Sequence, residues 1–244
     1  MSLQNSFQDK VIAITGASGA LGQALIAVFS EAGANIIALT THAQAEFPPG
    51  TEVVTWEVGQ EQALRPYLQR ADILVINHGV NVYGDRTPVA MQQSYEVNAF
   101  SALRLANLFL ALVAEGDRGA AEQSAKELWV NTSEAEVSPA FSPLYELSKR
   151  TLGDLITLRR LDAPCVIRKL ILGPFKSRLN PYGVMSAPWV ARTIVTLAQW
   201  QVRNIIVTVN PMTYLTFPLK ECSQSLYFRC FTRRQDEAIG HDSV

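Results

Sequence analysis

The feature that most constrains this chain is a glycine-rich turn between a short apolar run and a helix-forming stretch. The turn, Thr15-Gly16-Ala17-Ser18-Gly19-Ala20-Leu21-Gly22, follows the apolar run 11–14 and precedes apolar residues at helical spacing. Gly33 favours a helix end, and the run 36–39 has the composition of a second strand. This order predicts a strand–turn–helix–strand unit of an α/β fold.

The three glycines of this turn have separate physical uses. Gly16 permits a tight bend, Gly19 lets a backbone approach a pyrophosphate without a Cβ in the way, and Gly22 lets the helix pack close to its strand. The helix N-terminus adds free N–H groups and the positive end of a dipole. A sharp loop without a ligand would show the same glycines, but the flanking strand and helix favour a dinucleotide site.

Composition and charge limit the classes of protein. With 244 residues, 48% hydrophobic and 18% charged, the chain is long enough for one large α/β domain. A formal net charge of -1 provides no basic field for nucleic acid. Cys165, Cys222 and Cys230 lack metal-ligand spacing, which predicts free thiols in a reducing compartment and a metal-free site.

The N-terminal segment and the apolar runs of the sequence indicate where in the cell the protein is expected. No basic segment followed by a signal-type apolar region opens the sequence, and no uninterrupted apolar run approaches the roughly 20 residues of a membrane span. These observations predict a soluble, cytoplasmic protein, with peripheral membrane contact as the alternative.

The rest of the chain alternates between strand-like and helix-like runs. Strands are expected at 53–56, 72–77, 128–131, 165–172 and 205–209, and helices at 61–70, 91–115, 144–161 and 189–200. This alternation predicts an α/β fold with a doubly wound parallel sheet of the Rossmann type in a single domain. We place that domain at 1–211, followed by an amphipathic helix and polar tail at 212–244.

Over roughly residues 8–210 the chain resembles the short-chain dehydrogenase/reductase family. The resemblance rests on the glycine turn and on Asn77-His78-Gly79, Asn98, Ser133 and Tyr145-Glu146-Leu147-Ser148-Lys149. It implies an NAD(P)-dependent oxidoreductase that interconverts an alcohol and a carbonyl. By this resemblance Tyr145 exchanges a proton with the substrate oxygen, and Lys149 hydrogen-bonds the nicotinamide ribose. Ser133 would hold the substrate oxygen, and Asn98 would support a water relay to Lys149.

The resemblance also implies which residues line the cofactor. They come from the glycine turn, the strand ends and the catalytic helix: Gly16, Ser18, Gly19, Ala20, Leu21, Gly22, Thr40, Thr41, Glu57, Val58, Asn77, His78, Gly79, Tyr145, Lys149, Gly173 and Ser177. NAD-specific sites carry an acid about 20 residues beyond the turn. Here that place is Leu39-Thr40-Thr41-His42, which would not repel a 2′-phosphate, although no Arg or Lys completes a clamp. NADP is therefore expected, with NAD as the alternative.

Tyr145 and Lys149 stand four residues apart, so a helix would present them on one face. An ammonium about 5 Å from a phenol, at an effective dielectric of about 20, favours the phenolate by roughly 3 kcal/mol. That corresponds to a phenol pKa about two units below the usual value near 10. We therefore expect Lys149 to bring Tyr145 toward neutral pH for acid/base work.

Several positions leave alternatives open. His78 is expected to be a core histidine rather than a second acid/base group. Thr132 could take the role of Ser133, because the segment between Ser133 and Tyr145 is short. The segment 177–188 is also short, so a substrate lid would be small or supplied by the tail.

The substrate is expected to be hydrophobic. The tail around Tyr214-Leu215-Thr216-Phe217-Pro218-Leu219-Lys220 resembles dehydrogenase regions that accompany sterol desaturase or fatty-acid hydroxylase domains, which makes a sterol or lipid the alternative substrate class. A different class of function is a sensor or scaffold that binds the dinucleotide without turnover. The set Asn98, Ser133, Tyr145 and Lys149 favours the enzyme, because a binding module has no need of an acid/base pair.

Two apolar surfaces predict partners. The outer face of the helix 100–113 is apolar enough to predict a homo-dimer or tetramer. In the tail, a stripe recurs at helical spacing with basic flanks that include Lys220: Leu215, Leu219, Cys222, Leu226 and Cys230. This stripe would either lie on an anionic membrane or close the protein's own core.

Overall fold

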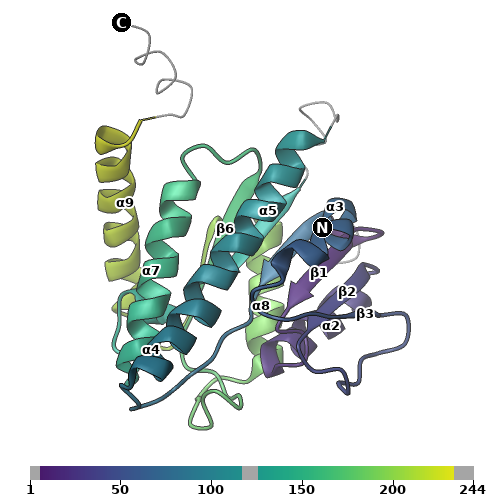
Figure 1. Cartoon of the computed structure of the whole chain (residues 1–244), viewed down its shortest axis with the longest axis horizontal. Helices are drawn as coiled ribbons and strands as arrows, with labels where there is room; N and C mark the ends of the chain where they lie inside the picture. Colours follow the sequence, from purple (N-terminus) through teal and green to yellow (C-terminus); the bar gives the residue numbers. More distant parts are fainter. Residues whose placement is uncertain (1–5, 117–125, 234–244) are drawn as a thin grey trace, which may run out of the picture.

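Seven parallel strands form one sheet in the computed structural model, which describes residues 6–116 and 126–233 (Figure 1). The strands are β1 (Val11–Thr15), β2 (Asn35–Thr40), β3 (Glu52–Thr55), β4 (Ile73–Ile76), β5 (Glu127–Asn131), β6 (Val166–Leu172) and β7 (Asn204–Val207). Their order in the sheet is β3-β2-β1-β4-β5-β6-β7. The predicted doubly wound Rossmann sheet in a single domain is confirmed.

Helices cover both faces of this sheet. Ile12 and Ile14 point toward α2 (Ala20–Glu31) and α8 (Ala187–Gln199). Ala13 and Ile37 point to the other face, which is covered by α3 (Arg65–Arg70), α5 (Ser101–Glu115) and α7 (Pro143–Arg159). Because successive strand residues alternate between faces, the central strands are apolar at every position.

The strand order reverses between β1 and β4, the place at which doubly wound folds have their binding crevice. The chain passes from β1 to β2 on one side, and β4 pairs with β1 on the other side. Ligands of doubly wound folds bind outside the carboxyl ends of the strands at such a reversal. The glycine turn after β1 and the segment Asn77-His78-Gly79 after β4 therefore meet at this point.

The helix expected at 91–115 is divided in three. α4 (Pro88–Tyr95) passes through a single π-helical turn, η2 (Glu96–Phe100), into α5. Such wide turns recur at functional sites, and this one contains Asn98. By length and composition the stretch Pro88–Glu115 could cross a membrane, but 61% of its most apolar part is buried inside the fold.

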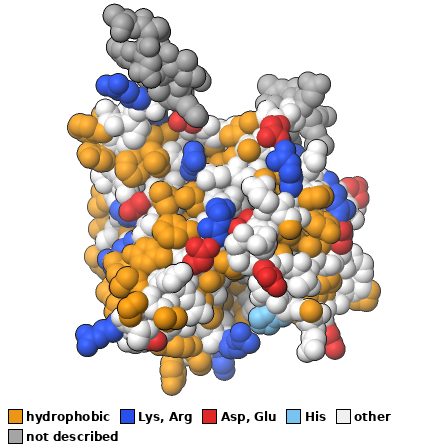
Figure 2. Space-filling view, in the orientation of Figure 1, with side chains coloured by type: hydrophobic (Ala, Val, Ile, Leu, Met, Phe, Trp, Pro, Cys, Tyr) orange, Lys and Arg blue, Asp and Glu red, His pale blue; other side chains and the backbone are white. Residues whose placement is uncertain are grey.

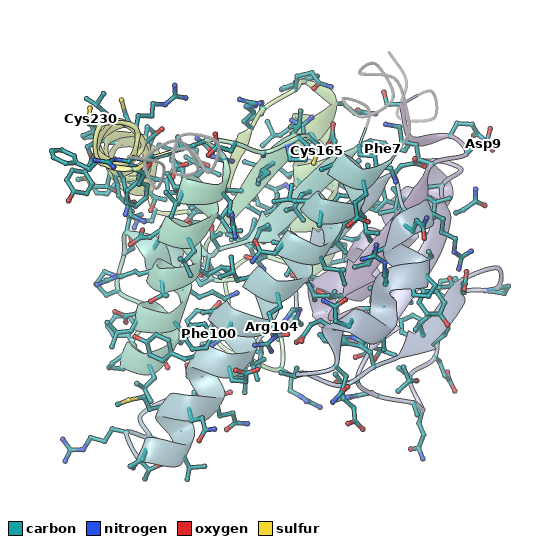
Figure 3. All side chains as sticks on the ribbon, turned by 45° about the horizontal axis from the view of Figure 1, so that its top comes forward. Phe7, Asp9, Phe100, Arg104, Cys165 and Cys230 are labelled. Atoms are coloured by element: carbon teal, nitrogen blue, oxygen red, sulfur yellow. The ribbon has the colours of Figure 1, made fainter. Side chains whose placement is uncertain are left out.

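The apolar outer face expected for residues 100–113 is largely covered. Leu110, Leu112 and Val113 are buried, because α3 and α7 pack against α5. Phe100, in η2, stays exposed and lies one turn before Arg104 (Figure 3). This face therefore offers Phe100, and not a continuous apolar surface, to a second copy of the chain.

The tail helix α9 (Thr213–Phe231) packs on the outer side of α7 (Figure 1). Its buried face consists of Thr213, Phe217 and Glu221. The predicted stripe of Leu215, Leu219, Cys222, Leu226 and Cys230 faces solvent instead, and Figure 3 shows α9 nearly end-on with side chains spread outward. The expectation that this stripe closes the core is wrong, because ionic contacts on another face hold the helix. Residues 234–244 of the tail lie outside the described residues.

Those ionic contacts connect α9 to the body of the domain. Glu221 Oε2 lies 2.9 Å from Lys169 Nζ on β6, and Glu221 Oε1 lies 2.8 Å from Arg160. Lys220, expected on a basic outer flank, instead turns inward to Glu136 and Asp154 at 2.8 and 2.7 Å. Glu136 belongs to η3 (Glu134–Glu136), which follows β5.

Candidate active site

Close packing explains two glycines of the first turn. Gly16 has a φ of +62, and a Cβ there would lie 2.9 Å from the Cα of His78. A Cβ on Gly22 would lie 2.3 Å from the carbonyl oxygen of Gly16. The turn, α2 and the end of β4 are therefore packed too closely for side chains at these positions.

The N-terminus of α2 opens at this turn. Gly19 is its N-cap, no side chain caps the helix, and its first turn carries no acidic residue. Its first N–H groups and dipole end thus suit the phosphates of a dinucleotide. The glycine cradle and the uncapped helix together fit the cofactor that the sequence predicts, with Ser18, Ala20 and Leu21 between the two outer glycines.

The end of β2 provides hydroxyl groups near the turn. The hydroxyl of Thr40 donates to Ser18 Oγ at 3.2 Å and accepts from the N–H of His42 at 3.0 Å. Thr40 is buried, whereas Thr41 is exposed. Thr41 is consequently the residue of the pair whose side chain meets solvent at the end of β2.

His78 is held inside the fold. Its Nδ1 lies 2.8 Å from Thr15 Oγ1, and its ring meets Trp56 edge-on at 5.3 Å between centroids. Burial, followed by the positive charge of Lys149, lowers the pKa of His78 to about 3. The ring is neutral and packed, as expected for a core histidine.

Asn98 connects the loop after β4 to α7 through hydrogen bonds. Its Oδ1 accepts from the N–H of Val80 at 2.8 Å, and its Nδ2 donates to the carbonyl of Val80 at 2.9 Å and to Ser148 Oγ at 3.0 Å. A Cβ on Gly79 would lie 3.1 Å from Asn98 Oδ1. The amide of Asn98 therefore acts through these protein contacts and positions the loop.

Tyr145, Lys149 and Ser133 come together at the end of β5. Lys149 Nζ lies 5.9 Å from the centre of the Tyr145 ring and donates to the carbonyl of Asn131 at 2.9 Å. Ser133 has a φ of +73 and forms a side-chain hydrogen bond with Tyr145. A non-glycine residue in this backbone region is strained, and such strain is often found at active sites.

The electrostatics of the pair differ from the expectation. Burial raises the pKa of Tyr145, and the hydrogen bond with Ser133 opposes that rise. Burial also lowers the pKa of Lys149 to about 8, against the opposing effect of Glu136. The expected net lowering of the Tyr145 pKa is wrong for this geometry, since burial raises this pKa and the Lys149 ammonium donates to Asn131.

Thr132 and Ser133 are distinguished by their surroundings. Thr132 is fully buried, and its Oγ1 has no hydrogen-bond partner among the described residues. Ser133 contacts Tyr145 and accepts from the N–H of Ala135 at 3.2 Å. The geometry favours Ser133 as the hydroxyl next to Tyr145.

Solved structures share this architecture. A short-chain dehydrogenase of Burkholderia cenocepacia J2315 in complex with NADP covers 96% of this chain and 100% of its own, with a TM-score of 0.72 and 16% identity. The aldohexose dehydrogenase of Thermoplasma acidophilum covers 85% of this chain and 94% of its own, with a TM-score of 0.68 and 16% identity. This chain has the Rossmann fold of these two dehydrogenases.

A curated relative is much closer in sequence. The monoglucosyldiacylglycerol epimerase of Synechocystis sp. (strain ATCC 27184 / PCC 6803 / Kazusa) is 57% identical over 235 residues, which are 94% of this chain and 56% of the relative. The chain thus spans about half the length of the curated relative that it matches. No protein-family model matches the chain.

Within this Rossmann fold, Asn131 is a residue that sequence reasoning missed. Its carbonyl holds Lys149, and its Nδ2 donates to Asn77 Oδ1 at 3.0 Å. Its place at the carboxyl end of a central strand was the available signal. Glu136, which influences the pKa of Lys149, gave no such signal, because its partners come from distant parts of the chain.

The other predicted cofactor residues follow β3 or β6 in the chain. Glu57 and Val58 follow β3, which is two strands from β1 in the sheet order. Ser177 lies in a turn after β6, where its N–H donates to the carbonyl of Asn180 at 3.0 Å. A Cβ on Gly173 would lie 2.3 Å from Thr208 Oγ1, so this glycine is needed for packing of the loop.

Proposed function

We propose that this chain is the NAD(P)-dependent catalytic domain of an epimerase that acts on the sugar headgroup of a glycosyl diacylglycerol. The observation that carries the proposal is the cluster of Tyr145, Ser133 and Lys149 at the same carboxyl end of the sheet as the uncapped N-terminus of α2. The relative, a monoglucosyldiacylglycerol epimerase, supplies the substrate class. A sensor without turnover would have no use for this cluster.

Epimerisation inverts one carbinol carbon and leaves the substrate's oxidation state unchanged. The glycine turn and the N-terminus of α2 would hold a nicotinamide dinucleotide, which would supply reversible hydride transfer to and from that carbon. Tyr145 would accept the hydroxyl proton while the carbonyl forms and give it back when the carbinol is restored. Ser133 would hydrogen-bond the reacting oxygen throughout, and Lys149 would hold positive charge next to the phenol. Atoms and electrons balance over the cycle without a second redox partner.

NADP is the proposed cofactor. Support comes from the exposed hydroxyl of Thr41 at the end of β2, where NAD-specific sites carry an acid. A similarly folded short-chain dehydrogenase binds NADP. NAD stays the alternative, because no Arg or Lys stands between Leu39 and Gly50.

Assembly and membrane contact belong to the same proposal. The exposed Phe100 and Leu147 favour a homo-dimer or tetramer, for which light scattering should give a mass of two or four chains. A diacylglycerol substrate also requires this protein to meet a bilayer. The exposed stripe on α9 is one surface for peripheral contact, over which Figure 2 shows hydrophobic side chains at the left of the view.

The proposal is tested by sugar analysis of the lipid product. The full chain would be incubated with NADP⁺ and monoglucosyldiacylglycerol in detergent micelles, and the headgroup released and identified. The epimer should appear without net accumulation of NADPH. Tyr145→Phe should lower the rate by about 10²–10⁴-fold, because the transferable proton is lost. The matched variant Tyr95→Phe, on α4, should keep the wild-type rate.

Two results would contradict parts of this scheme. A Tyr145→Phe rate within about tenfold of wild type would reject the acid/base role. One NADPH formed per product would show a dehydrogenase that stops at the carbonyl rather than an epimerase.

A further inference from the structure

Apolar side chains are exposed on the loops around the crevice. Four loops follow the carboxyl ends of β4, β5, β6 and β7, and they carry the exposed residues Tyr83, Phe141, Leu179, Tyr182, Val184 and Met212, which we call the rim. Phe141 and Tyr182 are 98% and 91% exposed, so almost their whole rings meet solvent. Figure 2 shows hydrophobic side chains with basic ones beside them along the lower edge, where these loops lie in Figure 1.

Hydrogen bonds connect the loops of the rim. Ser142 Oγ donates to Asn81 Oδ1 at 2.6 Å, and it lies 3.0 Å from the carbonyl of Tyr83. The Tyr83 hydroxyl donates to the carbonyl of Arg178 at 3.3 Å. The loops after β4, β5 and β6 therefore form one connected surface around the site.

Backbone strain accompanies the exposure of two aromatic residues. Tyr83 and Phe141 both have a φ of +54, a conformation that bulky residues rarely adopt. Each such residue costs on the order of 1–3 kcal/mol unless its surroundings hold it there. Burial does not compensate this cost for Phe141, whose ring touches almost nothing in the fold.

The loops that carry the rim also carry exposed charged side chains, and these are mainly positive. Arg86, Lys176 and Arg178 are exposed there, and Asp85 is the exposed acid. The acids of the loop after β5, Glu134 and Glu136, are buried and bonded to Thr208 and Lys169. The rim thus has an excess of positive charge although the whole chain has a formal net charge of -1.

We propose that the rim docks on an anionic lipid bilayer, so that a glycolipid headgroup enters the crevice directly from the membrane. This inference rests on the proposed function for its substrate class. Aromatic and aliphatic side chains ringed by cations bind at the headgroup level, where rings are half in the apolar region and cations meet lipid phosphates. Because the same loops supply Ser133 and border Tyr145, docking would bring the reacting groups to the membrane surface.

Vesicle flotation tests the rim without any turnover. The full chain would be mixed with vesicles of phosphatidylcholine alone or with about 30% phosphatidylglycerol, conditions in which electrostatic attraction to anionic lipid is measurable. The wild type should float with the anionic vesicles. Phe141→Ser combined with Tyr182→Ser should lower the bound fraction at least about tenfold, because the two apolar anchors are lost. Arg178→Gln should lower it about fivefold.

Trp200→Ser is the matched control. Trp200 is an exposed aromatic residue at the end of α8, before β7, and so at the opposite edge of the sheet. It should bind vesicles like the wild type. Unchanged melting temperatures would show that all variants are folded.

The outcomes separate this inference from the proposed function. Equal flotation of the wild type and the Phe141/Tyr182 double variant, or no flotation of the wild type, would overturn the rim as the docking surface. Loss of flotation on Leu215→Ser with Leu219→Ser alone would assign membrane binding to α9 instead. Failure of the epimerase assay alongside rim-dependent flotation would leave the docking surface intact and reject only the reaction.

Discussion

Lys169 and Glu136 form an ion pair at 2.9 Å, and both side chains are completely removed from solvent. Glu136 follows Ser133 by three residues in the chain, and Lys169 also contacts Glu221 of α9 at 2.9 Å. The charge of Glu136 acts on the pKa of Lys149 as well. One buried set of charges therefore connects α9 to η3, the turn that follows Ser133.

Removal of one member of this set should destabilise the fold. Lys169→Met should lower the free energy of unfolding by about 3 kcal/mol or more, because Glu136 and Glu221 lose their shared cation. Adding Glu136→Gln should cost less than the sum of the two single changes. Urea denaturation measures both. Arg70→Met, which breaks the exposed pair with Glu52, is the control, and its free energy of unfolding should stay within about 1 kcal/mol of wild type. If Lys169→Met lowered the free energy of unfolding no more than Arg70→Met, a stabilising role of the buried charges would be contradicted.

Substitution of the two neighbouring hydroxyl residues after β5 should have different effects on turnover. Ser133→Ala should lower turnover by about tenfold or more, since removing a hydrogen bond to the reacting group costs about 1.5–3 kcal/mol. Thr132→Val should leave turnover near wild type and should not lower the melting temperature, because the buried Thr132 hydroxyl has no partner within residues 6–116 and 126–233. Steady-state rates and thermal melts of both variants distinguish the residues. A larger loss of turnover for Thr132→Val would assign the role to Thr132.

Acid should destabilise the fold through His78. Its pKa is about 3 in the folded chain and about 6.5 unfolded, so the unfolded state takes up the proton first. The free energy of unfolding should therefore fall as pH drops below about 6.5, by up to about 2 kcal/mol from His78 between pH 7 and pH 5. Denaturation at the two pH values should show a smaller difference for His78→Gln. The exposed His42→Gln should match the wild type, and an unchanged slope in His78→Gln would contradict this account.

Cofactor choice should depend on the end of β2. Thr41→Asp places a carboxylate where NAD-specific sites bind the ribose hydroxyl. The affinity for NADP should fall at least about tenfold relative to NAD, because the carboxylate repels the 2′-phosphate. Fluorescence titration with NADPH and NADH measures the ratio, with Thr41→Val as the uncharged control. An unchanged ratio would show that the 2′ position does not lie beside Thr41.

The sequence by itself was enough for the parts of this protein that depend on local spacing. The order of apolar runs and glycines predicted the parallel sheet, because strand and helix periods are properties of neighbouring residues. The spacing of Tyr145 and Lys149 likewise placed both on one face of α7, since four residues make about one helical turn.

Only the tertiary structure decided what surrounds those residues. The direction of the Tyr145 pKa depends on burial by distant segments, and the choice of Ser133 over Thr132 depends on a left-handed backbone that no spacing reveals. The outward stripe of α9 and the inward Lys220 follow from partners in η3 and α7. Such contacts join residues far apart in the chain, and their energies depend on the solvent that the fold excludes.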